Sequence, residues 1–233
     1  MIKYSLLYPY YRREHVLDWT LKSIRKFYAG RQDLEIIFVV DLKNTTQDRD
    51  MLIERLVPYW DTLRLRVISN DLLTYNCARA FNLAARQAEG EYLILSNPEC
   101  RHLNDILGGL DATFADTPDV YTICACQSHD DNGMFLEWYQ HSAHRPDNFH
   151  WLSALSRQQY HAIGGFDEEY SYGIAYEDND WFARVRRARV PVIVRDDLCV
   201  AHQAHSRCYQ NQALIAKNAK LFAQKWPDGY PID

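Results

Sequence analysis

The sequence lacks a long apolar run. No stretch of the 233 residues approaches the ~20 apolar residues that a helix needs to cross a bilayer. The N-terminus lacks a signal-peptide layout as well, because its apolar stretch is short and no small-residue cleavage site follows it. These absences predict a cytoplasmic protein without a transmembrane segment, and they leave peripheral association with a membrane open.

Excess positive charge and patterned cysteines are also missing. The 26 Lys and Arg residues are outnumbered by 31 Asp and Glu residues, so we expect no broad binding to nucleic acid. The six cysteines are scattered, with neither zinc-ligand spacing nor a disulfide framework. Repeats, linkers and low-complexity segments are absent too. We therefore expect one domain over residues 1–233, with reduced cysteines.

Strand and helix patterns alternate along the first hundred residues. The apolar run Leu34–Val40 is typical of a strand buried on both faces of a parallel sheet. The expected strands are 2–8, 34–40, 63–69, 91–96, 120–127, 151–155, 190–194 and 198–201. The expected helices are 12–28, 50–56, 76–88, 103–114, 157–163, an acidic helix after residue 176, and 209–224. This order predicts a single α/β domain whose mixed, mostly parallel sheet is flanked by helices.

Polar residues follow several of the predicted strands. They are Tyr8-Pro9, Asp41, Ser69-Asn70 and Asn97-Pro98-Glu99. We expect Pro9 to end the first strand, since proline cannot continue a central strand. Ligands of open parallel sheets bind beyond the carboxyl ends of the strands. The sequence therefore predicts a binding site where these polar residues gather.

An acidic stretch follows a predicted tight turn. The turn is Gly164-Gly165-Phe166-Asp167, where paired glycines permit positive φ. Glu177, Asp178 and Asp180 then precede the apolar residues of a helix. Such acids can simply cap the helix, because its dipole favours negative charge there. Alternatively, one carboxylate acts as a general base, with its pKa raised by its neighbours.

These landmarks resemble the glycosyltransferases of the GT-A fold, in particular the large inverting family 2. Tyr8–Arg12 stands where that family has a Pro-x-Tyr-Asn turn, and Asp41 stands at its donor-contacting acid. Gly164–Glu168 matches its GGFDE signature, and Glu177–Asp180 matches its Glu-Asp-x-Asp motif. The resemblance covers nearly the whole chain. It implies a nucleotide-sugar-binding half over residues 1–100 and an acceptor-binding half over residues 101–233.

Three further segments are similar to the β1,4-galactosyltransferases and chondroitin-synthesising enzymes. Asn76-x-Ala78-Arg79-x-x-Asn82 is similar to their Asn-x-Ala-Lys-x-x-Asn helix, with Arg in place of Lys. Tyr172–Asp178 is similar to their Trp-Gly-x-Gly-Gly-Glu-Asp segment. His205-Ser206-Arg207 is similar to the His-Ser-Arg whose histidine binds the metal.

The resemblance implies an inverting, metal-assisted transfer of a sugar from a UDP-sugar to a hydroxyl of a glycan or glycoconjugate. Asp178 would be the base, and Glu177 would orient the donor sugar or the acceptor. The implied donor-binding residues are Tyr8, Pro9, Tyr11, Asp41, Asn70, Arg79 and Asn97. The implied acceptor-binding residues are Gly165, Tyr172, Tyr176, Asp180 and Trp181, although the aromatic ones could equally pack the domain. The implied Mn²⁺ or Mg²⁺ ligands are Glu99, His205 and His202.

The chain departs from the family where the metal-binding Asp-x-Asp is expected after the fourth strand. Asn97-Pro98-Glu99 stands there instead, and it supplies a single carboxylate. His202 and His205 could compensate, although a packed histidine is an equal alternative for His202. A sugar-binding protein with a degenerate site therefore remains an alternative. A nucleotidyltransferase is disfavoured, since Tyr8–Arg13 contains no glycine for a phosphate loop.

Overall fold

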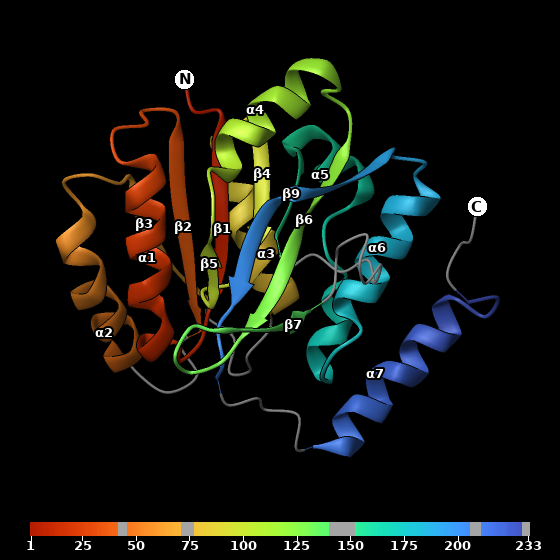
Figure 1. Ribbon diagram of the computed structural model, residues 1–233. Coiled ribbons are helices and arrows are strands. Elements are labelled where there is room, and N and C mark those ends of the chain that lie inside the picture. Colours follow the sequence, from red (N-terminus) through yellow and green to blue (C-terminus); the bar gives the residue numbers. More distant parts are fainter. Residues whose placement is uncertain (42–45, 71–76, 140–151, 206–210, 230–233) are drawn as a thin grey trace.

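A computed structural model describes residues 1–41, 46–70, 77–139, 152–205 and 211–229, with residues 41, 46 and 47 by their backbone alone. It contains one large sheet with helices on both faces (Figure 1). The strands are β1 (Tyr4–Tyr10), β2 (Leu34–Asp41), β3 (Leu65–Asn70), β4 (Tyr92–Ser96), β5 (Cys100–His102), β6 (Tyr121–His129), β7 (Phe135–Trp138), β8 (Leu152–Ser156) and β9 (Val192–His202). The α-helices are α1 (Glu14–Tyr28), α2 (Thr46–Leu56), α3 (Cys77–Gln87), α4 (Ile106–Asp116), α5 (Arg157–Ile163), α6 (Glu177–Arg187) and α7 (Gln212–Lys225). Short 3₁₀ turns form at Val57–Tyr59 and, as η2, at Glu168–Tyr172.

The strand order is β3-β2-β1-β4-β8-β6-β9-β5, and β7 pairs with β6. Strands β1 to β4 are parallel, and β8 lies antiparallel between β4 and β6. Because β9 is parallel to β6, six strands share one direction and end at the same edge of the sheet. The expected mixed α/β sheet is confirmed.

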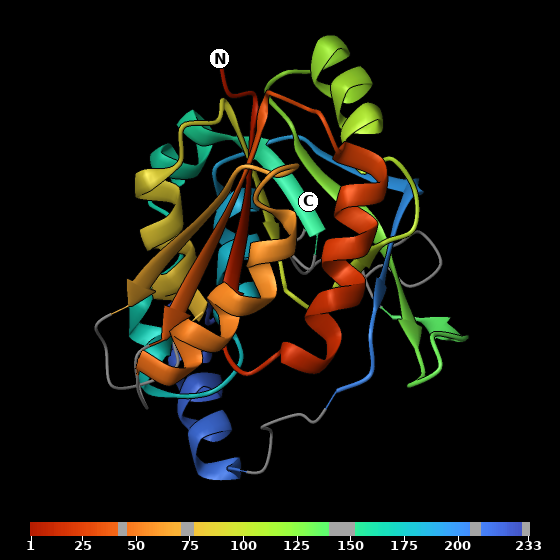
Figure 2. The same ribbon diagram turned by 90° about the vertical axis from the view of Figure 1, so that its left-hand side faces the viewer.

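Two hydrophobic clusters cover the two faces of the sheet. Helices α1, α2 and α4 pack on one face, against even-numbered residues of β1 such as Leu6. Helices α3, α5 and α6 pack on the other, against odd-numbered residues such as Leu7. Figure 2 shows α1 and α2 in front of the strands, with α3 beyond them. This alternation explains why β1 and β2 carry nearly continuous apolar runs.

None of the helices in the described ranges combines the length and the apolar character needed to cross a bilayer.

The structure corrects two strand predictions. Strand β1 continues through Pro9, which pairs with Val39 of β2. Proline is tolerated here because the pairing of β1 with β4 ends at Leu7, so the ladder on that side needs no further N–H donor. The two short strands predicted near the C-terminus form the single strand β9. Its register with β6 shifts across the polar segment Arg195–Asp197, which explains the interruption in the apolar pattern.

Strand β5 was not predicted, because three residues are too few to show a period. It pairs antiparallel with β9 and places Cys100 opposite His202. The consequence for the candidate site is described below.

A buried carboxylate ties β2 to its neighbours. Glu35 is fully buried and accepts hydrogen bonds from the Ser5 hydroxyl at 2.6 Å, the Glu89 backbone N–H at 2.6 Å and Arg66 at 2.9 Å. Burial alone would raise the pKa of Glu35, but these donors outweigh it and hold the pKa below its usual range. The ionised form therefore stabilises the fold.

We expect Glu35→Gln to lower the free energy of unfolding by about 1–3 kcal/mol at pH 7, because a buried charge-assisted hydrogen-bond set is lost. In the wild type this contribution is complete above the unfolded pKa of about 4.3 and is lost as the pH falls through the lower folded pKa. Denaturant unfolding between pH 3 and pH 7 measures both effects. The control is Glu89→Gln, whose side chain is exposed and should change stability by under about 0.5 kcal/mol. Equal effects in the two variants would contradict the prediction.

Candidate functional site

The carboxyl ends of β1 to β4, β6 and β9 meet at one edge of the sheet, the lower edge in Figure 1. Cys77, the first residue of α3 after β3, reaches Glu177 at the start of α6, with 3.5 Å between its Sγ and Oε1. Glu99 lies between β4 and β5, close to the end of β9. Two acidic centres predicted from sequence therefore lie at the edge where ligands of open parallel sheets bind.

The first centre is the carboxylate pair Glu177 and Asp178. Both side chains are partly exposed, and both belong to the first turn of α6. Burial, and secondly the adjacent charge of Glu177, raise the pKa of Asp178 to about 7. Burial also raises the pKa of Glu177. A carboxylate that titrates near neutral pH is suited to general-base chemistry.

The backbone before this pair is strained. Ala175 and Tyr176 have φ values of 63° and 70°, a left-handed conformation that non-glycine residues adopt at a cost. Asn218 of α7 is buried, and its amide donates to the carbonyl oxygens of Tyr170 at 2.9 Å and Ala175 at 2.7 Å. A Cβ on Gly173 would meet the Asn218 side chain at 2.1 Å. Helix α7 therefore holds the loop that presents Glu177 and Asp178.

A second buried amide holds the glycine turn. The Asn82 side chain donates to the carbonyl oxygen of Phe166 at 2.9 Å, and its own oxygen accepts from the Phe166 N–H at 2.9 Å. Gly165 has φ 68°, and a Cβ there would meet the Asn82 oxygen at 2.5 Å. This close approach explains the glycine. Gly165 thus shapes the turn through its backbone.

The second centre consists of Glu99, His202 and His205. One potential ligand atom from each residue lies within 4.8 Å of the other two. The His205 Nε2 atom lies 3.4 Å from Glu99 Oε1 and 3.4 Å from His202 Nε2. The His202 ring stacks on Tyr139, with ring centroids 4.9 Å apart. Glu99, His202 and His205 are thus brought together as the sequence predicted.

The pairing of β5 with β9 creates this cluster. Gln203, which follows β9, donates its backbone N–H and its side-chain amide to the Glu99 carbonyl oxygen, at 3.1 and 2.9 Å. The Thr20 hydroxyl of α1 donates to the Pro98 carbonyl oxygen at 2.7 Å and accepts from the Gln203 amide at 3.0 Å. The turn after β4 is therefore fixed from both sides.

The charge of Glu99 is balanced within the cluster. Burial alone would raise the pKa of Glu99, but the His205 hydrogen bond, Arg13 and His202 lower it to about 2. The Arg13 Nε atom lies 3.4 Å from Glu99 Oε2. An ionised carboxylate beside two imidazoles is a donor set that fits a divalent cation, provided that other ligands complete its coordination.

Three predicted ligand-contacting residues belong to the core instead. Tyr8 is fully buried and stacks on Phe38, with centroids 5.1 Å apart. Trp181 is fully buried and stacks on Phe166 at 4.9 Å. Asp180 is 1% exposed and forms an ion pair with Arg184 at 2.8 Å. Tyr8 and Trp181 therefore pack the domain. The structure corrects the prediction that Tyr8 contacts the donor, and the prediction that Asp180 and Trp181 contact the acceptor.

The other residues predicted to bind the donor lie in different surroundings. Asn70 is buried, and its amide oxygen accepts from Arg79 Nε at 3.0 Å, so it helps to position Arg79. Arg79 also lies 3.4 Å from Glu168. Asn97 is half-buried in the turn after β4, where its carbonyl oxygen accepts from the Cys100 N–H at 2.9 Å. Tyr11 is half-buried just beyond β1. The Asp41 side chain lies outside the described part of the structure, as do Asn76, Ser206 and Arg207 of the predicted motifs.

Two acceptor-side aromatic residues remain accessible. Tyr172 is 70% exposed, with Lys217 Nζ 5.4 Å from the centre of its ring. Tyr176 is half-buried against Phe222 of α7.

Sequence reasoning missed Arg13 and Asn218 as site residues. The position of Arg13 just after the first strand could have marked it as a site residue. Its contact with Glu99 could not be predicted, because Glu99 is 86 residues away in the sequence. Asn218 carried no signal, because an asparagine in a polar helix is unremarkable until the loop packed on it is known.

We expect Asn218→Asp to lower the free energy of unfolding by about 1–3 kcal/mol, because the two donated hydrogen bonds to buried carbonyl oxygens are lost while the shape is kept. Denaturant unfolding measures the loss. Gln224→Glu, an exposed change of the same charge on the same helix, is the control and should stay within about 0.5 kcal/mol of the wild type. A wild-type stability for Asn218→Asp would show that α7 does not hold this loop.

Known proteins resemble this chain in both sequence and structure. Two validoxylamine A glucosyltransferases, from Streptomyces hygroscopicus subsp. limoneus and subsp. jinggangensis (strain 5008), are each 22% identical over 97% of this chain. The chain spans 57% and 62% of their lengths. S. aureus TarS 1-349 in complex with UDP-GlcNAc has a TM-score of 0.74 at 15% identity, over 100% of this chain and 68% of that one. The mannosyltransferase PcManGT from Pyrobaculum calidifontis, in complex with GDP-Man and Mn²⁺, has a TM-score of 0.71 at 16% identity, over 97% and 65%.

At such identities the structural likeness establishes the fold, and the expected GT-A arrangement is confirmed. The family model described as Glycosyl transferase family 2 matches residues 5–176, which is well over half of the sequence. The chain therefore belongs to glycosyl transferase family 2.

Proposed function

We propose that this protein is an inverting glycosyltransferase that moves a sugar from a UDP-sugar to a hydroxyl of a glycan or glycoconjugate, as in polysaccharide biosynthesis. Family membership supports transfer of a sugar. Structural neighbours solved with UDP-GlcNAc, or with GDP-Man and Mn²⁺, support a nucleotide-sugar donor and a divalent cation. The chain covers only part of its glucosyltransferase relatives, so the particular sugar and acceptor are not carried over from them.

The observation that carries the proposal is the pairing of two acidic centres at one edge of the sheet. Glu99, His202 and His205 converge there, and Glu177 and Asp178 open α6 at the same edge. A nucleotide-sugar transferase needs both features, because the diphosphate charge must be balanced while a base removes the acceptor proton.

Asp178 serves as the base in this proposal. Its carboxylate takes the proton from the acceptor hydroxyl as the hydroxyl oxygen attacks the anomeric carbon from the side opposite UDP. This backside attack inverts the anomeric centre. Glu177 orients the sugar or the acceptor, and its charge helps to keep the pKa of Asp178 near 7. Tyr172 offers an exposed ring for stacking on a sugar.

Glu99, His202 and His205 would hold the Mn²⁺ or Mg²⁺ ion, with Asn97 nearby as a neutral oxygen ligand. Such an ion offsets the charge that develops on the departing diphosphate. Arg13 and Arg79 add fixed positive charge, and their carboxylate partners at 3.4 Å keep them in position. The further likeness to galactosyltransferase motifs stays a prediction.

The base assignment predicts that Asp178→Asn lowers transfer by ~10²-fold or more, the scale of general-base loss, while UDP affinity is kept. Since the carboxylate acts ionised, wild-type kcat/KM should rise with pH through about 7 and level off above it. The measurement is release of UDP from a panel of UDP-sugars, with calorimetry for UDP binding. Asp131→Asn, an exposed change in the β6–β7 turn, should keep wild-type rates. Near-normal transfer by Asp178→Asn would remove Asp178 from the mechanism.

The metal assignment predicts weak binding of Mn²⁺ alone and much tighter binding with UDP. The cluster supplies one formal negative charge, and the diphosphate supplies the missing oxygens. Calorimetric titration of Mn²⁺ with and without UDP measures this, and Glu99→Ala and His205→Ala should each lose the UDP-dependent binding. His161→Ala, on the exposed face of α5, is the control. Tight Mn²⁺ binding without nucleotide, or full activity in EDTA, would contradict the assignment.

A further inference from the structure

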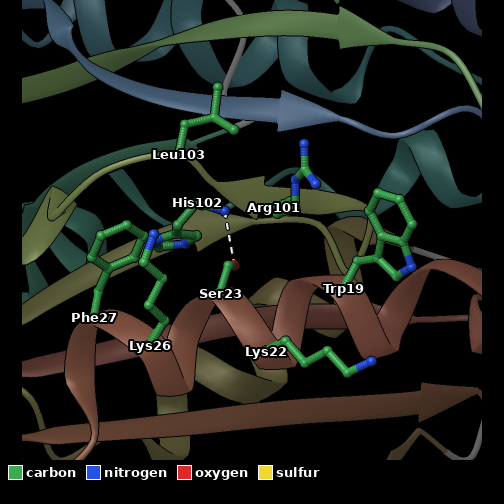
Figure 3. A pocket seen from close by; sticks show the side chains of 8 residues that line it. All are labelled: Trp19, Lys22, Ser23, Lys26, Phe27, Arg101, His102 and Leu103. Carbon is green, nitrogen blue, oxygen red and sulfur yellow. Dashed lines mark hydrogen bonds between the residues drawn. The ribbon is translucent and has the colours of Figure 1, made fainter. Parts of the chain in front are cut away.

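A groove of about 540 Å³ lies between α1 and β5, on the face of the sheet opposite α6. Its lining is shown in Figure 3 and comprises Trp19, Lys22, Ser23, Lys26, Phe27, Arg101, His102 and Leu103. Three of these residues are cationic and none is acidic, although the whole chain has a formal net charge of −5. The groove therefore concentrates positive charge on an acidic protein.

The lysines of the groove have no acidic partner on their own helix. Lys22 and Lys26 are exposed and one turn apart on α1, an arrangement in which like charges repel. Asp18, one turn before Lys22, is engaged by Arg55 at 3.1 Å. An anion bound in the groove reduces this repulsion.

Arg101 is held in place by neutral groups. Its guanidinium lies 5.1 Å from the centre of the Trp19 ring, and one of its terminal nitrogens lies 3.3 Å from His129 Nδ1. Its buried Nε has no hydrogen-bond partner among the described residues. Arg101 therefore keeps a charged donor for a ligand, because no carboxylate in the described part of the chain neutralises it.

His102 adds a buried neutral donor. The Tyr28 hydroxyl accepts from the Ile106 N–H at 3.1 Å and lies 2.7 Å from His102 Nδ1. We assign the Tyr28 proton to this contact, which places the His102 proton on Nε2; that atom is buried and has no partner among the residues described. His102 is 2% exposed, and burial lowers its pKa to about 3, so the ring is neutral. An unsatisfied buried donor of this kind is costly unless a ligand accepts from it.

We propose that this groove binds a phosphate monoester carried on an aromatic or aliphatic body. Lys22, Lys26, Arg101 and His102 line it with donors, which suits a group with three acceptor oxygens and about −1.5 to −2 charge. Trp19, Phe27 and Leu103 supply apolar walls for the body of the ligand. The inference is independent of the proposed transferase chemistry, because none of the residues proposed for proton transfer or metal binding lines the groove.

The test uses phenyl phosphate as the probe, titrated into the full chain in EDTA so that no metal-dependent nucleotide site contributes. We expect a Kd of about 1 mM or tighter, weakening as salt is raised. We also expect the ¹⁵N signal of His102 Nε2 to shift on binding. Lys22→Gln/Lys26→Gln removes two exposed charges and should weaken binding at least ~10-fold.

The control Arg49→Gln/Lys220→Gln removes the same charge from exposed positions on α2 and α7 and should bind like the wild type. Absence of phenyl phosphate binding, or equal binding by the two double variants, would overturn the proposal unless lipid phosphate binds instead. Vesicles of phosphatidylcholine with and without phosphatidic acid decide that point. Binding that requires phosphatidic acid and is lost in Lys22→Gln/Lys26→Gln identifies a lipid phosphate as the source. Failure of both probes, or absence of phenyl phosphate binding together with equal binding to both kinds of vesicle, overturns the proposal.

Discussion

The antiparallel pairing of β5 with β9 is the contact on which the candidate site depends. Three residues of β5 bring Glu99 beside two histidines more than a hundred positions later in the chain. Side chains of α1 and of the segment after β9 fix the turn through hydrogen bonds to backbone carbonyl oxygens. This pairing is what brings the carboxylate and the imidazoles, which are distant in the sequence, into one cluster.

Two buried asparagines play the same part around the first acidic centre, Glu177 and Asp178. Asn82 ties the glycine turn to α3, and Asn218 ties the strained loop at Ala175 and Tyr176 to α7. In both cases a single side-chain amide satisfies backbone groups that no regular ladder reaches, which buried polar groups require. The resulting backbone sets the direction in which Glu177 and Asp178 leave the start of α6. Left-handed residues at a functional loop are maintained only when their surroundings over-determine them.

Charge balance differs between the carboxyl edge of the sheet and the groove between α1 and β5. At the carboxyl edge, Glu99 is held ionised by Arg13 and two histidines, while burial and mutual repulsion raise the pKa of Asp178. One carboxylate is therefore suited to hold a cation and the other to accept a proton. The groove between α1 and β5 has cations without acids, so it is suited to a ligand that brings its own negative charge.

The sequence alone determined the class of fold and pointed to the glycosyltransferase family, because strand and helix periods, strand-exit residues and the GGFDE and EDND motifs are local patterns. It could not determine which side chains are reachable. Tyr8, Asp180 and Trp181 were expected at ligands but are buried, since burial depends on elements that pack from elsewhere in the chain. Nor could it reveal β5, Asn218 or the pairing of Arg13 with Glu99, because each acts across tens of residues or more. Local periodicity can be predicted from the sequence, whereas contacts between side chains distant in the sequence depend on tertiary packing.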